Sequence, residues 1–224
     1  MSKIKAIIFD MDGVLIDAKE WHYEALNRAL SLFGYEIKRY DHLVTYDGLS
    51  TAQKLEMLSI EKGLPRKLHR FINELKQQYT MEKVHTDCHP LFIHEYALST
   101  LRSNGYHIVV ASNSIRNTVQ IMMQKSNLLQ YLDFYLSNQD VKKAKPDPEI
   151  YQTAISRLNL QPFECMIVED NYNGIVAAKA SMANVMEIKS VFDVNYENII
   201  KHIEIFEKKN RKGFEIEHSC SNCK

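Results

Sequence analysis

The sequence predicts an α/β protein with a Rossmann-like, three-layer core on a parallel sheet, and with an all-helical cap inserted into that core. Two observations predict this fold. Short apolar runs, of the kind that strands buried on both faces require, alternate along most of the chain with segments of helical period. One stretch of about 70 residues near the N-terminus has helical period alone, and no strand-like run interrupts it.

Five apolar runs are predicted to be strands. The first is nearly continuous between residues 4 and 9, as expected of a parallel strand that is buried on both faces. The later runs are residues 107–111, 134–136, 165–168 and, more weakly, 184–188. Because helical segments separate these runs, the strands are expected to pair in parallel.

Four helices are predicted between these strands, at residues 95–104, 117–126, 148–158 and 173–181. Their ends carry the usual signals. Asp147 can cap a helix that has Pro148 at its first position, and Gly105 stands where the preceding helix should stop.

The all-helical stretch is predicted to be a separate cap, residues 18–88, inserted between two parts of the sheet-containing core, residues 1–17 and 89–206. Within the cap, an apolar stripe begins at Trp21, and further helices are expected at 51–61 and 65–79. The insert leaves the sheet at the edge where ligands of parallel sheets bind, so we expect it to act as a lid. Residues 207–224 are expected to form a polar, flexible tail.

Charge and composition exclude several classes of partner. The 28 Lys and Arg balance the 28 Asp and Glu, so no global positive field would attract nucleic acid or an anionic membrane. The apolar run at the start is too short for a signal peptide, and no segment approaches the roughly 20 apolar residues of a membrane span. We expect a cytoplasmic protein; the sequence gives no indication of its oligomeric state.

The four cysteines, Cys88, Cys165, Cys220 and Cys223, do not form the pattern of a disulfide framework. The last two resemble half of a zinc knuckle, but no second pair of ligands lies at a suitable spacing. We therefore interpret them as incidental thiols of the tail.

Chemistry-bearing residues follow the first two long strands. Asp10 and Asp12 come directly after the first strand, although Asp12 and Gly13 are also an ordinary turn signal. Ser112 and Asn113 follow the second, where a hydroxyl and backbone amides could hold a phosphoryl oxygen; loops and helix caps use the same residue types.

Two further groups lie later in the chain. Lys145 offers a positive charge just before a capped helix, or is one of three solvated surface lysines. Glu169 and Asp170 follow the fourth strand and suit a hard cation such as Mg²⁺, while Asp170 could instead cap the next helix. All four groups are expected at one edge of the sheet, where together they would suffice for phosphoryl transfer.

The ordered set Asp10-Met11-Asp12-Gly13-Val14, Ser112, Lys145 and Glu169-Asp170 resembles the four motifs of the haloacid dehalogenase superfamily, in the subgroup with a helical (C1-type) cap. The resemblance covers about residues 3–206. It implies that Asp10 is the nucleophile and a metal ligand, and that Asp12 is the general acid and base and binds the metal through its backbone carbonyl. It further implies that Asp170, and Glu169 directly or through water, bind Mg²⁺, that Ser112 binds the phosphoryl group, and that Lys145 neutralises it.

Within that superfamily, Asp12 is the acid two positions after the expected nucleophile. In this feature the sequence resembles the phosphatases and phosphomutases and not the dehalogenases. His22 matches a histidine of the β-phosphoglucomutase-like mutases, but it could also simply face the edge of its helix. Thr51 stands where those mutases carry an arginine for a second phosphate.

We therefore predict a Mg²⁺-dependent phosphatase acting on a small phosphorylated metabolite, a sugar phosphate by preference, with specificity set by the cap loop around residues 46–51. A phosphomutase is the alternative, and a non-catalytic phosphate-binding regulatory protein is a third candidate.

Overall fold

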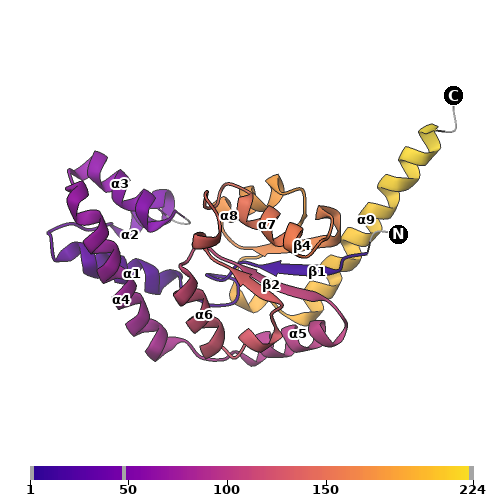
Figure 1. Ribbon diagram of the computed structural model, residues 1–224, viewed down its shortest axis with the longest axis horizontal. Coiled ribbons are helices and arrows are strands. Elements are labelled where there is room, and N and C mark those ends of the chain that lie inside the picture. The colour runs from indigo at the N-terminus through magenta and orange to yellow at the C-terminus, as the bar shows by residue number, and fades with distance from the viewer. Residues whose placement is uncertain (1–2, 47–48, 222–224) are drawn as a thin grey trace.

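The computed structural model describes residues 3–46 and 49–221 (Figure 1). Its centre is a parallel five-stranded sheet in the order β3-β2-β1-β4-β5. The strands are β1 (Ala6–Phe9), β2 (His107–Ala111), β3 (Phe134–Leu136), β4 (Cys165–Glu169) and β5 (Asn184–Glu187). All four β1 residues are buried, as its continuous apolar run predicts.

Strand register places the candidate residues at one edge of the sheet. Phe9, the last residue of β1, is paired with Val110 of β2 and with Val168 of β4. The chain therefore leaves the sheet at neighbouring positions, after Phe9 in β1, after Ala111 in β2 and after Glu169 in β4. This edge is the carboxyl end of every strand, where parallel sheets bind their ligands.

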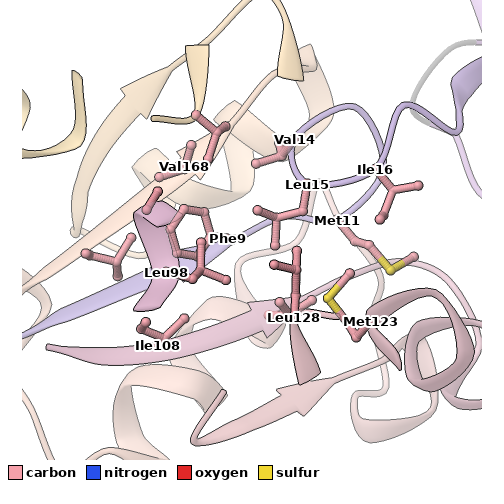
Figure 2. Packing of buried hydrophobic residues seen from close by; sticks show 14 of the residues in the cluster. Phe9, Met11, Val14, Leu15, Ile16, Leu98, Ile108, Met123, Leu128 and Val168 are labelled. Atoms are coloured by element: carbon pink, nitrogen blue, oxygen red, sulfur yellow. The ribbon is translucent and has the colours of Figure 1, made fainter. Parts of the chain in front are cut away.

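Helices cover both faces of the sheet and make the predicted three layers (Figure 1). One face packs on α5 (Phe92–Ser103), α6 (Arg116–Lys125) and α9 (Tyr196–Ser221), and the other packs on α7 (Glu149–Arg157) and α8 (Tyr172–Ala180). Side chains of β1 alternate between the two apolar clusters, with Ile7 and Phe9 on the first face and Ala6 and Ile8 on the second. Figure 2 shows Phe9 within the first cluster, close to Leu98, Ile108 and Val168.

Only helical elements lie between β1 and α5 in the part of the chain that the structure describes. They are α1 (Lys19–Ser31), α2 (Arg39–Asp41), a π-helical turn η1 (His42–Tyr46), α3 (Thr51–Lys62), a 3₁₀ turn η2 (Arg66–Leu68) and α4 (His69–Asp87). They have an apolar core of their own, which includes Leu26, Leu30, Leu58 and Ile72. Further 3₁₀ turns connect core elements at η3 (Leu129–Tyr131), η4 (Asn138–Asp140), η5 (Pro162–Glu164) and η6 (Val191–Asp193).

The structure differs from the sequence prediction at two helices. Helix α4 continues beyond the expected end at 79 to Asp87, because Thr80 and Val84 extend its buried stripe. Where a polar flexible tail was expected from 207, α9 continues as helix to Ser221. Ile199 and Ile203 anchor the first turns of α9 in the core, and the charged residues that follow are good helix formers. Cys223, and Asp47 and Gly48 of the loop expected to set specificity, lie outside the described residues.

Two of the cysteines, Cys88 and Cys165, are buried free thiols, as expected for a protein without a disulfide framework. Among the described residues, no helix has both the length and the apolar character needed to cross a bilayer.

Candidate active site

The loop after β1 turns sharply and requires a glycine at position 13. The Asp10 amide continues the sheet ladder by donating to the Val168 carbonyl at 3.0 Å. Gly13 has a φ of 91°, and a Cβ at this position would lie 2.2 Å from Oδ2 of Asp170. The Asp12-Gly13 turn and the close approach of Asp170 are therefore features of the same bend.

Lys145 reaches Asp10 from the loop before α7. Its ammonium donates to Asp10 Oδ1 at 2.6 Å, to Glu169 Oε1 at 2.7 Å and to the Ala111 carbonyl at 2.9 Å. Only 3% of the residue is exposed, so it is not a solvated surface lysine. Burial alone would lower the pKa of Lys145, but Asp10 and Glu169 raise it above its ordinary value, which keeps the ammonium charged.

Asp10 itself is buried, with 5% of its surface exposed. Burial raises the pKa of Asp10 well above its ordinary value, Lys145 opposes this, and the carboxylates of Glu169 and Asp170 add to it. A further positive charge at this site would therefore favour the ionised, nucleophilic form of Asp10.

Glu169 is fully buried and held on several sides. Besides Lys145, its carboxylate accepts from the Tyr151 hydroxyl at 2.5 Å and from the Asp170 amide at 3.1 Å. A Cβ on Gly174 would lie 1.9 Å from Glu169 Oε1, so a glycine is required where α8 passes this carboxylate. These contacts hold the Glu169 carboxylate in place next to Lys145, which also contacts Asp10.

The helix after β4 is capped by Asn171 and not by Asp170, the alternative that the sequence left open. The Asn171 side chain accepts from the Gly174 amide at 3.0 Å. The carboxylate of Asp170 instead forms an ion pair with Lys19.

One oxygen each from Asp10, Glu169 and Asp170 can be chosen so that all three lie within 4.8 Å of one another. Such oxygens are the ligands that Mg²⁺ prefers, and these residues therefore fit the expected ion. The Asp12 side chain is not part of this cluster within the described residues. Its expected role as a metal ligand depends on its backbone carbonyl and stays a prediction.

The carboxylate of Asp12 faces a different set of groups. Its Oδ2 accepts from the Ser114 hydroxyl at 2.9 Å, and His22 Nε2 lies 3.1 Å from its Oδ1. The Lys76 ammonium lies 3.1 Å from His22 Nδ1; because an ammonium only donates, the hydrogen of a neutral His22 ring lies on Nε2, toward Asp12.

Burial, neighbouring charges and hydrogen bonds shift the pKa values of Asp12 and His22. Burial alone would raise the pKa of Asp12, but His22, Ser114 and Lys76 lower it below its ordinary value. Burial and then Lys76 lower the pKa of His22. Asp12 is thereby kept ionised and able to accept a proton.

The residues after β2 line the same cavity. Ser112 is buried, and its hydroxyl accepts from the Ser114 amide at 3.0 Å. Asn113 bonds the backbone of Lys145, accepting from its amide at 3.1 Å and donating to its carbonyl at 3.4 Å. Asn113 thus holds the loop that carries Lys145. The substrate contact expected of Asn113 stays a prediction.

A cavity of about 630 Å³ lies between the sheet edge and the helices of the insert. Asp10, Asp12, Ser112 and Lys145 line it from the core. The opposite wall carries two residues singled out from the sequence, His22 and Thr51, together with the cationic side chains Lys54, Arg70 and Lys76. The volume suits a small metabolite.

Sequence reasoning missed several contacting residues, among them Ser114, Tyr151, Lys19 and Lys76. Tyr151 lies on the apolar face of α7, where a tyrosine is typical of an ordinary core residue. Lys19 had no distinguishing signal. Lys76 did have one, because it interrupts a stripe of buried residues at four-residue spacing, Ile72, Thr80 and Val84.

Comparison with known proteins finds relatives of similar length. The pyrophosphatase PpaX of Bacillus velezensis is 29% identical over 186 residues, which cover 79% of each chain. A phosphorylated carbohydrates phosphatase of Thermotoga maritima is 28% identical over 184 residues, 80% of this chain and 82% of that one.

The fold also matches solved structures. The crystal structure of β-phosphoglucomutase from Clostridium difficile superposes with a TM-score of 0.77 at 23% identity, over 91% of this chain and 98% of the other. The family model described as haloacid dehalogenase-like hydrolase matches residues 7–188. The shared fold, the order of the motifs and this match agree, and the chain belongs to the haloacid dehalogenase-like hydrolases.

Proposed function

We propose that the protein is a Mg²⁺-dependent phosphatase that hydrolyses a small phosphorylated metabolite through a phosphorylated Asp10. The observation that carries this proposal is the separation of two carboxylates at one sheet edge. Asp10 lies against Lys145 and the acidic cluster, whereas Asp12 lies against Ser114 and His22. Two carboxylates in such different surroundings can take different roles, one as nucleophile and one as proton carrier.

The residues of the chain then divide the reaction between them. A carboxylate oxygen of Asp10 attacks the phosphorus atom, and the bond to the leaving oxygen breaks as Asp12 donates a proton to that oxygen. Asp12, now ionised, takes a proton from water, and the resulting hydroxide attacks the phosphorus and releases phosphate and Asp10. Because the surroundings of Asp12 favour its ionised form, the structure as it stands is prepared for the second step.

Electrostatic support for this reaction comes from both sides of the phosphoryl group. Lys145 would offset the charge of the phosphoryl oxygens, and the Ser112 hydroxyl would bind one of them. Mg²⁺ bound by Asp10 and Asp170, with Glu169 directly or through water, would supply further positive charge against which the phosphoryl oxygens are stabilised.

The insert is proposed to be a cap, residues 18–88, over a core of residues 1–17 and 89–206. Its separate apolar core supports this division, and its cationic wall faces the catalytic residues across the cavity. A cap that excludes water favours small substrates over folded proteins.

A sugar phosphate is the proposed substrate class. The phosphorylated carbohydrates phosphatase and the pyrophosphatase among the relatives support small phosphorylated compounds in general. We place the activity in the cytoplasm, in line with the two buried free thiols.

The test is release of phosphate from a panel of sugar phosphates, other phosphorylated metabolites and pyrophosphate, with and without Mg²⁺. We expect metal-dependent turnover of at least one small ester. In acid-quenched reactions, the protein should also retain a base-labile phosphoryl group that Asp10→Asn lacks. Binding of phosphate without any turnover would favour the regulatory protein instead.

A phosphomutase is the second candidate, because His22, which matches a histidine of the β-phosphoglucomutase-like mutases, lies 3.1 Å from the carboxylate of Asp12. Thr51 lines the cavity at the first turn of α3, where those mutases carry an arginine, and this weighs against it. Interconversion of hexose 1- and 6-phosphates that depends on a bisphosphate activator would identify a mutase; phosphate release without interconversion would identify a phosphatase.

A further inference from the structure

The ion pair between Lys19 and Asp170 joins the insert to the core at the acidic cluster. Lys19 is the first residue of α1, and Asp170 follows β4. The Asp170 side chain is 2% exposed, whereas the Lys19 side chain is 40% exposed and lines the cavity. The aliphatic stem of Lys19 passes over Gly13, where a Cβ would lie 2.6 Å from its Cε.

The two lysines at this site divide the acidic cluster between them. The Lys145 ammonium contacts Asp10 and Glu169, and the Lys19 ammonium contacts Asp170. A carboxylate as deeply buried as Asp170 needs a positive partner, since burying an uncompensated charge is costly. If all three carboxylates are ionised, Lys145 leaves a charge of −2 on the cluster, which one divalent cation would balance.

We propose that Lys19 is an internal counterion of Asp170 that a divalent cation displaces when it binds. The proposal rests on the metal site of the proposed function. A cation bound to Asp170 needs a carboxylate oxygen, and it is repelled by an ammonium on the same carboxylate. Lys19 therefore weakens metal binding. When the cation binds, the ion pair between Lys19 of the insert and Asp170 of the core is replaced by a contact between Asp170 and the cation, which lies within the core.

The consequence of the exchange lies in the cavity. The displaced ammonium stays on a flexible stem at the cavity wall, on the side of the acidic cluster. It is then available to an anionic substrate that enters the loaded site. The Lys19 ammonium thus pairs with Asp170 before the metal binds and can pair with an anionic substrate afterwards.

A purely structural ion pair predicts a different result when it is removed. If Lys19 only fastened the insert to the core, loss of its charge would lower stability and leave metal affinity unchanged. If Lys19 competes with the metal, loss of its charge must raise the affinity. Metal binding, measured without substrate, distinguishes the two.

The experiment is a titration of the full chain with Mn²⁺ as the probe, followed by the paramagnetic resonance of the unbound ion. The proteins are wild type, Lys19→Met and the matched control Lys142→Met, which removes another lysine that lines the same cavity. We expect Lys19→Met to bind Mn²⁺ about tenfold more tightly than wild type, on the scale of other neighbouring-group effects on metal sites. The control should bind like wild type. Equal or weaker binding by Lys19→Met would overturn the proposal.

Thermal unfolding gives a second readout. Without metal, Lys19→Met should unfold at a lower temperature than wild type, because Asp170 loses its partner, and Mn²⁺ should raise the unfolding temperature more in the variant. If Lys19→Met does not fold, Lys19→Gln serves in both measurements. Binding that is equal in all proteins overturns the role of Lys19 alone, whereas no binding in any of them also removes the metal site from the proposed function.

Discussion

The ammonium of Lys145 lies 2.6 Å from Oδ1 of Asp10, although 135 positions separate the two residues in the chain. The contact exists because Asp10, which follows β1, and the loop before α7, which carries Lys145, lie at the same edge of the sheet. It gives Asp10, the proposed nucleophile, a fixed orientation and a positive neighbour, in a site where burial alone would favour the protonated acid.

Asp10→Asn should abolish phosphate release and leave the fold intact. The amide has nearly the shape of the carboxylate, but it is a poor nucleophile and a weak ligand for Mg²⁺. Phosphate release and circular dichroism, measured on the same preparation, test this. Appreciable turnover by a folded variant would rule out Asp10 as the nucleophile.

Asp12→Ala should slow hydrolysis most for esters with poor leaving groups. An alkoxide needs a proton as it departs, whereas nitrophenolate leaves without one. We expect the ratio of alkyl-phosphate to nitrophenyl-phosphate turnover to fall by roughly a hundredfold or more, within the usual range of acid catalysis. Equal losses with both esters would argue against Asp12 as the general acid.

Lys145→Met should lower turnover at least several-hundredfold, because one preorganised electrostatic donor is worth roughly 3 kcal/mol. It should also destabilise the fold by about 3–5 kcal/mol near neutral pH, since Asp10 and Glu169 lose their buried partner. Lys145 lowers the pKa of Asp10, so the variant raises it further. A carboxyl with a raised pKa in the folded state loses stability as pH rises above its unfolded value, so the deficit should shrink toward pH 4.

Urea unfolding of wild type and Lys145→Met at several pH values measures that deficit. Tyr151→Phe is the matched variant, because it removes one hydrogen bond to Glu169 and no charge. It should cost only about 1–2 kcal/mol. A deficit in Lys145→Met that does not change with pH would contradict the buried ion pair as its cause.

Lys76→Met should stabilise the protein at pH 7 while impairing turnover. Burial lowers the pKa of Lys76 from 10.5 to about 8, so keeping this ammonium in the fold costs up to roughly 3 kcal/mol. The sign follows from proton binding. Between pH 8 and 10.5 the unfolded chain binds more protons at this residue, and wild-type stability should therefore rise across that range.

The measurement is the free energy of unfolding in urea at pH 7 and pH 9.5, for wild type, Lys76→Met and the exposed control Lys67→Met. Wild type should approach the stability of Lys76→Met at the higher pH, and the control should follow wild type at both. A Lys76→Met protein less stable than wild type at pH 7 would show that contacts with His22 outweigh the cost of burying the charge.

Gly174→Ala should disturb the acidic cluster directly. The new Cβ would meet the Glu169 carboxylate at about 2 Å, so either that carboxylate or helix α8 must move. We expect a loss of stability of about 1–3 kcal/mol together with weaker Mn²⁺ binding. Val176→Ala, on an exposed position of the same helix, is the control that should change neither property.

Most chemical groups of the site could be predicted from the sequence, because Asp10, Ser112 and Glu169 stand at the ends of runs that are apolar enough to be recognised as strands. Parallel pairing sends all carboxyl ends to one edge, so recognising the strands was enough to bring Asp10, Ser112 and Glu169 together. The all-helical insert could be recognised for the same reason, since no apolar strand pattern interrupts its helical period.

Only the tertiary structure decided which groups face each side chain. The local sequence left open whether Lys145 is solvated like its exposed neighbours Lys142 and Lys143, and only the packed loop buries it against Asp10. Likewise, helix geometry alone left the direction of His22 open; the packing of α1 on α4 turns it toward Asp12 and places Lys76 behind it. Local patterns thus determined which residues reach the sheet edge, whereas contacts between distant segments determined their charges and partners.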